Sequence, residues 1–100
     1  MRPEQLNGKK VIDTNAHIVG EISGIEVDMD RWTIKGVYVK LDDDSIVTLG
    51  FRKPRLRGKV EIFIPNSLIN AISDMVALNK NQQEIKELLV GKTIKISENP

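Results

Sequence analysis

The sequence predicts a mainly β protein: a small, strongly bent β-barrel with short helices and a C-terminal helix–strand extension. Two stretches of alternating apolar residues, 18–27 and 32–41, are each interrupted at a glycine, Gly24 and Gly36, where the alternation changes phase. A change of one residue sends the following side chains to the other face of a strand, and glycine permits the bend. Two long strands that both bend favour a coiled sheet that closes into a barrel.

The composition indicates one small domain with an aliphatic core. The chain has 100 residues, of which 40% are hydrophobic, and its aromatic residues are Trp32, Tyr38, Phe51 and Phe63. A domain of this length buries a modest fraction of its surface, so association with a second copy would add stability. We therefore expect a homodimer.

The sequence excludes several classes of protein. It has no cysteine, which rules out disulfides, thiol nucleophiles and metal sites built on thiolates. The N-terminal segment MRPEQLNGKK is polar, so we expect no signal peptide. No apolar run approaches the roughly 20 residues of a transmembrane helix. The net charge of +1 indicates no global preference for nucleic acid, and we expect a cytoplasmic protein.

The first half of the chain is expected to contain three strands. The first spans residues 9–13, and a turn leads into the two long strands, which the segment 28–31 joins as a hairpin. Trp32 shares the alternation phase of Ile34. This phase favours packing of Trp32 in the core, and the alternative is an exposed anchor for a partner.

A short helix is expected after the long strands, at residues 42–49. It begins with three aspartates, and carboxylates stabilise the positive N-terminal end of a helix. Ile46, Val47 and Leu49 would pack this helix on the barrel. Gly50 is suited to end it.

The second half of the chain is expected to alternate short strands and helices. The elements are predicted as a strand at 60–64, a helical turn at 67–72, a strand at 75–78, a helix from 81 and a last strand at 93–97. Asn81 and Glu84 fit a capping box, in which each side chain bonds to the backbone N–H of the other residue. Gly91 is suited to end that helix.

The segment GKKVIDTNAHIVGEISGIEVDMDRWTIKGVYVKL resembles the PRC-barrel family. The positions that carry the resemblance are Gly8, Lys9, Val11, Asp13, Val19, Gly20, Ile22, Asp28 and Gly36. KPRLRGKVEIFIP and ISDMVALN are similar to the second half of archaeal single-domain members, so the resemblance covers residues 6–79. The sequence departs from the family at Ala16, where the turn usually has glycine. A two-residue turn requires positive φ there, at a cost of about 1 kcal/mol for alanine, so we expect a longer or different turn.

This resemblance implies an interaction module without an enzymatic activity. Residues 1–79 would form the PRC-barrel-like domain. The helix and strand at 80–100 extend beyond the matching part, and we expect them to pack on the barrel or on a dimer partner. Some of the short archaeal members act as adaptors in cell division, bound to a SepF-like anchor, so the resemblance implies an adaptor for cytoplasmic complex assembly. The resemblance therefore implies a protein partner, with neither a cofactor nor a small-molecule substrate.

The only histidine, His17, lies in a segment that contains other metal-binding residue types, Asp13 and Asn15. An EF-hand loop would need glycine at its sixth position and glutamate at its twelfth, and neither residue is there. A triad of Ser45, His17 and Asp13 lacks the Gly-x-Ser-x-Gly elbow, and no Walker A loop is found. We interpret the segment as a hairpin turn, with no metal site and no catalytic residues.

The segment FRKPRLRGK is the most basic part of the chain. Its cations are the candidate partner-binding residues Arg52, Lys53, Arg55, Arg57 and Lys59. They would suit an acidic protein surface, or phosphates of RNA or of an anionic membrane, and a solvated loop is the simplest alternative. Single-strand RNA binders stack bases on aromatic side chains, and only Phe51 is adjacent. A protein partner is therefore favoured over an RNA-associated or ribosome-assembly factor that uses the loop 52–59.

Overall fold

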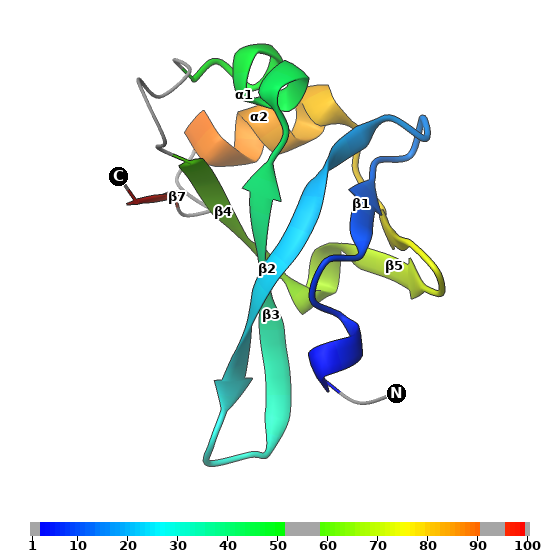
Figure 1. Ribbon diagram of the computed structural model, residues 1–100, viewed down its shortest axis with the longest axis vertical. Helices are drawn as coiled ribbons and strands as arrows, with labels where there is room; N and C mark the ends of the chain where they lie inside the picture. The colour runs from blue at the N-terminus through cyan, green and yellow to red at the C-terminus, as the bar shows by residue number, and fades with distance from the viewer. Residues whose placement is uncertain (1–2, 52–58, 91–95, 100) are drawn as a thin grey trace.

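The computed structural model describes residues 3–51, 59–90 and 96–99 (Figure 1). In chain order the elements are η1 (Pro3–Gln5), β1 (Lys10–Ile12), β2 (Ile18–Asp28), β3 (Thr33–Leu41), α1 (Asp43–Thr48), β4 (Lys59–Pro65), η2 (Asn66–Leu68), β5 (Ile69–Ile72), β6 (Val76–Leu78), α2 (Gln82–Val90) and β7 (Ile96–Asn99). The prediction of a mainly β protein with short helices is confirmed.

The strands form one mixed sheet. It has seven strands in the order β5-β6-β1-β2-β3-β4-β7, in which β1 pairs with β6 in parallel and the other neighbours pair antiparallel. Among the described residues, no pairing joins β5 to β7, so the sheet is open at both ends of this order. Closure into a barrel is therefore not confirmed.

The first predicted phase change is a β-bulge in β2. Ile22 pairs with Val39 and Gly24 with Tyr38, which leaves Ser23 without a partner in the register. An extra residue in one strand bends that strand and increases its twist. The change of face that the sequence predicts here is therefore confirmed.

The second phase change is a bulge in β3, where the register leaves Lys35 unpaired beside Gly36. Gly36 is also the position at which pairing with β4 stops, since its partner Pro65 ends that strand. Farther out, no described strand pairs with either member of the β2–β3 hairpin. Residues 25–35 therefore project from the body as a two-stranded ribbon, which we call the arm (Figure 1).

Apolar side chains from the sheet and from both α-helices form one core. Its buried members are Leu6, Val11, Val19, Ile22, Val37, Val39, Leu41, Ile46, Leu49, Val60, Ile62, Ile64, Val76, Leu78, Ile85 and Leu89. All are aliphatic, as the low aromatic content predicts. The expectation for Val47 is wrong: this residue is 59% exposed, because a helix presents only part of its circumference to the sheet.

Both α-helices begin with the caps that the sequence predicts. Asp42 accepts a hydrogen bond from the Ser45 backbone N–H at 2.8 Å. The Asn81 N–H donates to Glu84 Oε1 at 3.0 Å, and the Glu84 N–H donates to Asn81 Oδ1 at 2.8 Å. The capping box is therefore confirmed, and the expected stop at Gly91 lies outside the described residues.

One prediction of secondary structure differs from the structure, and another falls partly outside the described residues. The helical turn expected at 67–72 is helical only at Asn66–Leu68, after which the chain becomes strand β5. The reason is tertiary, since Ile69 and Ile72 pair with β6. The last strand is described at Ile96–Asn99, where it pairs with β4, and the first part of the predicted range 93–97 lies outside the described residues.

Asp13 joins the β1–β2 turn to the start of α2. This residue is buried, with 3% of its surface exposed. Its Oδ1 accepts hydrogen bonds from the N–H groups of Asn15 at 2.9 Å and His17 at 2.8 Å. Its Oδ2 accepts from the Gln82 N–H at 3.2 Å. One carboxylate thus satisfies backbone donors from a loop and from a helix N-terminus, where a negative charge is favourable.

Ala16 adopts positive φ, 62°, in a turn that is longer than two residues. The Ala16 N–H donates to the Asp13 carbonyl at 3.0 Å, and the Asp13 N–H donates to the His17 carbonyl at 3.0 Å. The loop is therefore residues 14–16, and three-residue hairpin loops place a left-handed residue at their third position. The expectation of a longer turn is confirmed, and the conformation is the one that glycine would adopt without strain.

Replacing Gly36 with alanine is expected to lower the free energy of unfolding by about 2–4 kcal/mol. A Cβ would collide with the Ile64 carbonyl oxygen and lie 2.8 Å from Pro65 Cα, so β3 and β4 would have to separate. Urea denaturation measures the loss. Gly24→Ala is the matched control, since its Cβ would meet only the Tyr38 ring, at 3.5 Å. Equal losses in the two variants would contradict the prediction.

Replacing Ala16 with glycine is expected to raise the free energy of unfolding by about 0.5–1 kcal/mol, because relief of the left-handed strain outweighs the added entropy of the unfolded chain. Thermal denaturation measures the gain. In the control Asn15→Gly, the replaced residue does not have positive φ, so that variant is expected to lose stability. A loss in both variants would show that the turn at Ala16 is not strained.

Candidate partner-binding surface

The arm ends in a group of exposed apolar side chains, which we call the tip cluster. Its members and exposed fractions are Val27 41%, Met29 64%, Trp32 79% and Ile34 38%. The expectation that Trp32 packs in the core is wrong. Trp32 lies in the turn before β3 begins at Thr33, so its alternation with Ile34 does not place it on the core face.

The turn at the tip is held by the side chain of Asp28. Asp28 Oδ1 accepts hydrogen bonds from the N–H groups of Asp30 at 3.0 Å and Arg31 at 3.3 Å. Trp32 follows with φ of 54°, a left-handed conformation that costs a bulky residue about 1–2 kcal/mol. Outlying backbone conformations of this kind concentrate at functional sites.

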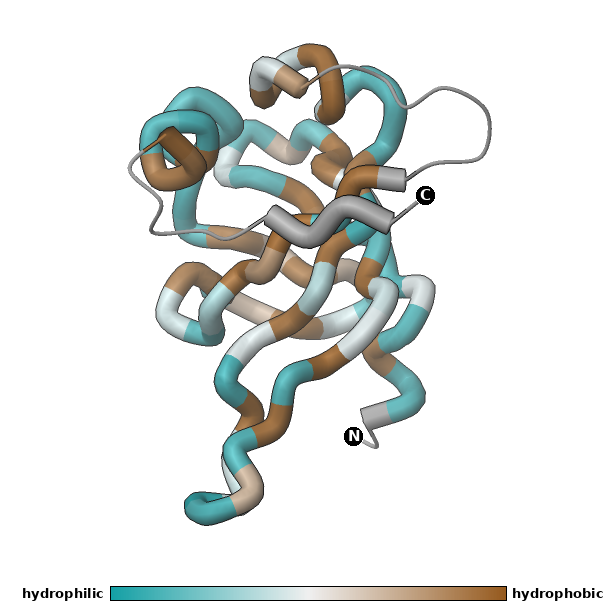
Figure 2. Tube along the Cα trace, turned by 90° about the vertical axis from the view of Figure 1, so that its left-hand side faces the viewer, coloured by the Kyte–Doolittle hydropathy of each residue, from teal (hydrophilic) through white to brown (hydrophobic). Residues whose placement is uncertain are grey.

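The two strands of the arm present Val27 and Ile34 on one face, while Met29 lies in the turn. Val27 and Ile34 are directly paired across the hairpin, so their side chains point to the same side of the ribbon. Asn66, in η2, donates from its Nδ2 to the Ile34 carbonyl at 2.7 Å and ties the arm to the body. Figure 2 shows hydrophobic and hydrophilic segments alternating along the arm as it leaves the body.

Polar contacts cross the sheet at the base of the arm. The Tyr38 hydroxyl donates to Glu26 Oε2 at 2.9 Å, and Ser23 Oγ donates to Glu61 Oε2 at 2.6 Å. The Tyr38 ring also packs against Phe63, with ring centroids 5.4 Å apart. These contacts join β2, β3 and β4 beside the bulge at Ser23 and hold the bend from which the arm extends.

The Glu26 carboxylate changes the acidity of Tyr38. The hydrogen bond to Glu26, then burial, then the negative charges of Glu26 and Glu61 raise the pKa of Tyr38 above its ordinary value of 10.0. The cause is physical, because a phenolate would lose the hydrogen bond and face two carboxylates. The neutral tyrosine is therefore the form that the folded sheet stabilises.

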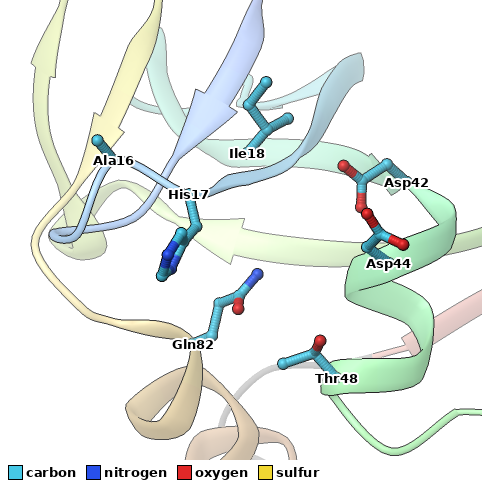
Figure 3. Close-up of a pocket in the computed structure, with 7 residues that line it drawn as sticks. All are labelled: Ala16, His17, Ile18, Asp42, Asp44, Thr48 and Gln82. Carbon is cyan, nitrogen blue, oxygen red and sulfur yellow. The ribbon is translucent and has the colours of Figure 1, made fainter.

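A second candidate site is an open depression beside His17, at the end of the body opposite the arm tip (Figures 1 and 3). It has a volume of about 470 Å³, and its lining residues are Ala16, His17, Ile18, Asp42, Asp44, Thr48 and Gln82. Asp42 and Asp44 form one wall, while His17 and Gln82 lie across from them (Figure 3).

The residues of the triad drawn from the sequence lie near this depression but do not form a triad. Ser45 is fully buried, and its Oγ donates to the Ile18 carbonyl at 3.0 Å and accepts from Gln82 Nε2 at 3.2 Å. His17 Nδ1 is 3.6 Å from Asp13 Oδ2, which is longer than a hydrogen bond. The hydroxyl therefore points into the structure and not toward the histidine.

Metal-ligating side chains do not gather in the described part of the chain. No group of three or more His, Asp or Glu residues is arranged to hold an ion there. Asp13, which the sequence placed beside Asn15 and His17 as a possible ligand, uses both oxygens for backbone N–H groups. This arrangement holds the turn in place.

The basic candidates from the sequence lie almost entirely outside the described residues. Arg52, Lys53, Arg55 and Arg57 belong to the segment 52–58, and Lys59 is the first residue of β4, where its backbone pairs with Asn99. The tip cluster is thus the candidate surface that the structure adds. The signal in the sequence was Met29 and Trp32, two large apolar residues within an otherwise charged turn.

Comparison with known proteins adds no identification. No protein-family model matches the chain, and no curated protein matches its sequence. Among the described residues, no helix is long and apolar enough to cross a membrane.

Because the chain has one tyrosine, its ionisation can be followed directly by ultraviolet absorbance. We expect Tyr38 to titrate above pH 10.0 in the folded protein. The stabilisation from the neutral phenol is complete below pH 10.0 and is lost as the pH rises through the raised folded-state pKa. Glu26→Gln should move the pKa back toward 10.0, because it replaces the hydrogen bond to a carboxylate with a weaker one to a neutral amide and removes a negative charge.

The matched control for this titration is Glu21→Gln, at a carboxylate that pairs with Lys10 and is not among the causes of the shift. This variant should leave the raised pKa of Tyr38 unchanged. Equal pKa values in the wild type and in Glu26→Gln would show that the contact between Tyr38 and Glu26 does not form in solution.

Proposed function

We propose that this chain is a non-enzymatic adaptor for cytoplasmic complex assembly and that the tip cluster is its principal protein-binding surface. The observation that carries the proposal is Trp32, which is 79% exposed at the end of an arm that the body does not cover. Tryptophan is enriched among the residues that contribute most to binding at protein interfaces.

The magnitude of this exposure supports a role in binding. An aromatic side chain presents about 150–250 Å², so covering the exposed part of Trp32 would contribute about 3–5 kcal/mol before the costs of association. Met29, Val27 and Ile34 are further exposed apolar side chains on the same arm. A turn in which Asp28 holds the backbone keeps the anchor in place, so binding requires little additional ordering.

We further propose that the chain is a PRC-barrel protein of the short archaeal type and that its bent sheet is that barrel. Support comes from the long β2–β3 hairpin, from its bulges at Ser23 and Lys35 and from the positive φ at Ala16. The long paired strands and a conformation suited to glycine at position 16 are features that the resemblance implies, while the bulges follow from the interrupted alternation at Gly24 and Gly36 and are compatible with it. On this proposal the complex is one of archaeal cell division, with a SepF-linked partner.

The second candidate function is an RNA-associated or ribosome-assembly factor that uses the loop 52–59. The observation in its favour is the local charge, with Arg52, Lys53, Arg55, Arg57 and Lys59 close together in sequence. Such a loop would suit phosphates. The tip carries Asp28 and Asp30 next to Trp32, which favours a protein over an anionic nucleic acid at that surface.

The immobilised wild-type protein is expected to retain a protein partner from extract of its source cells, and Trp32→Ser is expected to lose it. Retained proteins are identified by mass spectrometry. Val47→Ser is the control, because it removes an apolar side chain that is 59% exposed on α1. The proposal fails if the wild type retains no protein or if Trp32→Ser retains the same proteins.

The immobilised protein and the cell extract also distinguish the second candidate function from the first. An RNA association that weakens steeply with salt and is lost on reversing the charges of Arg55 and Arg57 would favour the RNA-binding factor. An adaptor that binds through the tip should show the opposite dependence, in which charge reversal leaves the protein partner bound and Trp32→Ser releases it.

A further inference from the structure

We propose that the arm tip binds a second copy of this chain, tip to tip about a two-fold axis. The inference rests on the proposed role of the tip cluster as a protein-binding surface and names its first partner. Three properties support this proposal. The tip carries charges of both signs, the arm has no third strand, and the charges of the tip do not complement those of the depression beside His17.

The tip carries charges of both signs beside its apolar anchor. Asp30 and Arg31 immediately precede Trp32, and among the described residues neither side chain has an ion-pair partner. A two-fold interface places the same surface of each copy against the other, so a surface must be complementary to itself. Asp30 of one copy and Arg31 of the other meet this requirement, with Trp32 and Met29 between them.

The arm also lacks the packing that a two-stranded ribbon needs. An isolated hairpin is marginally stable in water, and a further layer or strand is needed for independent stability. Ile25, at the base of the arm, packs against the core. Farther out, the hydrogen bond from Asn66 to the Ile34 carbonyl links the arm to η2, and no third described strand pairs with it. The face with Val27 and Ile34 on a second arm would supply the missing layer.

A head-to-tail contact is less suited to this tip. One hollow at the opposite end of the molecule is the depression beside His17, and one of its walls carries Asp42 and Asp44. Asp28 and Asp30 at the tip would face those carboxylates there, whereas the two-fold contact sets Asp30 against Arg31 of the other copy. Asp28 and Asp30 also disfavour nucleic acid and anionic lipid as occupants of the tip.

Self-association through the tip would make the adaptor bivalent. Each copy would keep the rest of its surface free and present it twice. A partner with two matching sites could then bind both copies at once. Its apparent affinity would rise without any new kind of contact, because the second site binds at a high effective concentration. Loss of the tip contact would therefore weaken the binding of such a partner, even if that partner contacts another surface of the chain.

The chain contains one tryptophan, so fluorescence reports directly on the tip. As the wild-type concentration rises into the high micromolar range, we expect Trp32 emission to shift to shorter wavelength and to become less accessible to a soluble quencher. Light scattering over the same range should show the mass doubling. The two transitions should coincide, because both measure the same association.

Paired variants test whether the tip is the contact. Met29→Ser should raise the dissociation constant by about tenfold or more. Met75→Ser, which removes the same side chain from a site 44% exposed outside the arm, should leave the dissociation constant unchanged. Asp30→Arg and Arg31→Asp should each weaken association, and the double exchange should restore it. Thermal denaturation checks that every variant folds.

A wild type that remains monomeric, or a dimer that survives Met29→Ser and both single charge reversals, would overturn the inference. The adaptor proposal has a separate readout. If the wild type is monomeric but Trp32→Ser still releases a protein retained from extract, the tip binds a different protein and only the inference fails. If the dimer forms by these criteria and no protein is retained, the inference stands and the adaptor proposal fails.

Discussion

The pairing of β2 with β3 is the constraint on which the rest of the structure depends. Over the inner part of this hairpin, β1 and β4 pair on its two sides, and alternate side chains such as Ile22 and Val39 enter the core. Over the outer part, the same two strands continue beyond their neighbours. Beyond Ile25, which still packs against the core, their apolar residues Val27 and Ile34 are exposed. A single hairpin thus provides both the centre of the fold and its exposed tip cluster, with Gly36 at the boundary.

The second organising feature is the Asp13 carboxylate. It lies where the β1–β2 turn meets the start of α2, and its oxygens accept from backbone N–H groups of both. Gln82 continues the connection to Ser45 in α1, whose Oγ donates to the Ile18 carbonyl. A buried carboxylate is stable only when its acceptors are satisfied. The residue types that suggested a metal or a catalytic site therefore have a structural use at this junction.

Ala16 and Trp32, the two residues other than glycine with positive φ in the described part of the chain, have different surroundings. Ala16 belongs to a turn that the buried Asp13 fixes to α2, so its strain is offset by contacts within the body. Trp32 belongs to a turn that is exposed to solvent and closed only by local bonds to Asp28. Exposing a large aromatic side chain in a strained conformation lowers the stability of the isolated chain. A partner that covers the Trp32 side chain would offset this cost. Contacts within the body offset the strain at Ala16, so the two turns differ in this respect.

Much of the fold, but little of the candidate surface, follows from the sequence alone. The bulges near Gly24 and Gly36, the caps at Asp42 and Asn81 and the unusual turn at Ala16 are determined locally, because each depends on backbone geometry within a few residues. The position of Trp32 and the strand conformation of β5 were decided by the tertiary structure. Alternation shows which residues share a face, but only the arrangement of neighbouring strands determines whether that face is covered. The arm extends past β1 and β4, and its apolar residues are exposed for that reason.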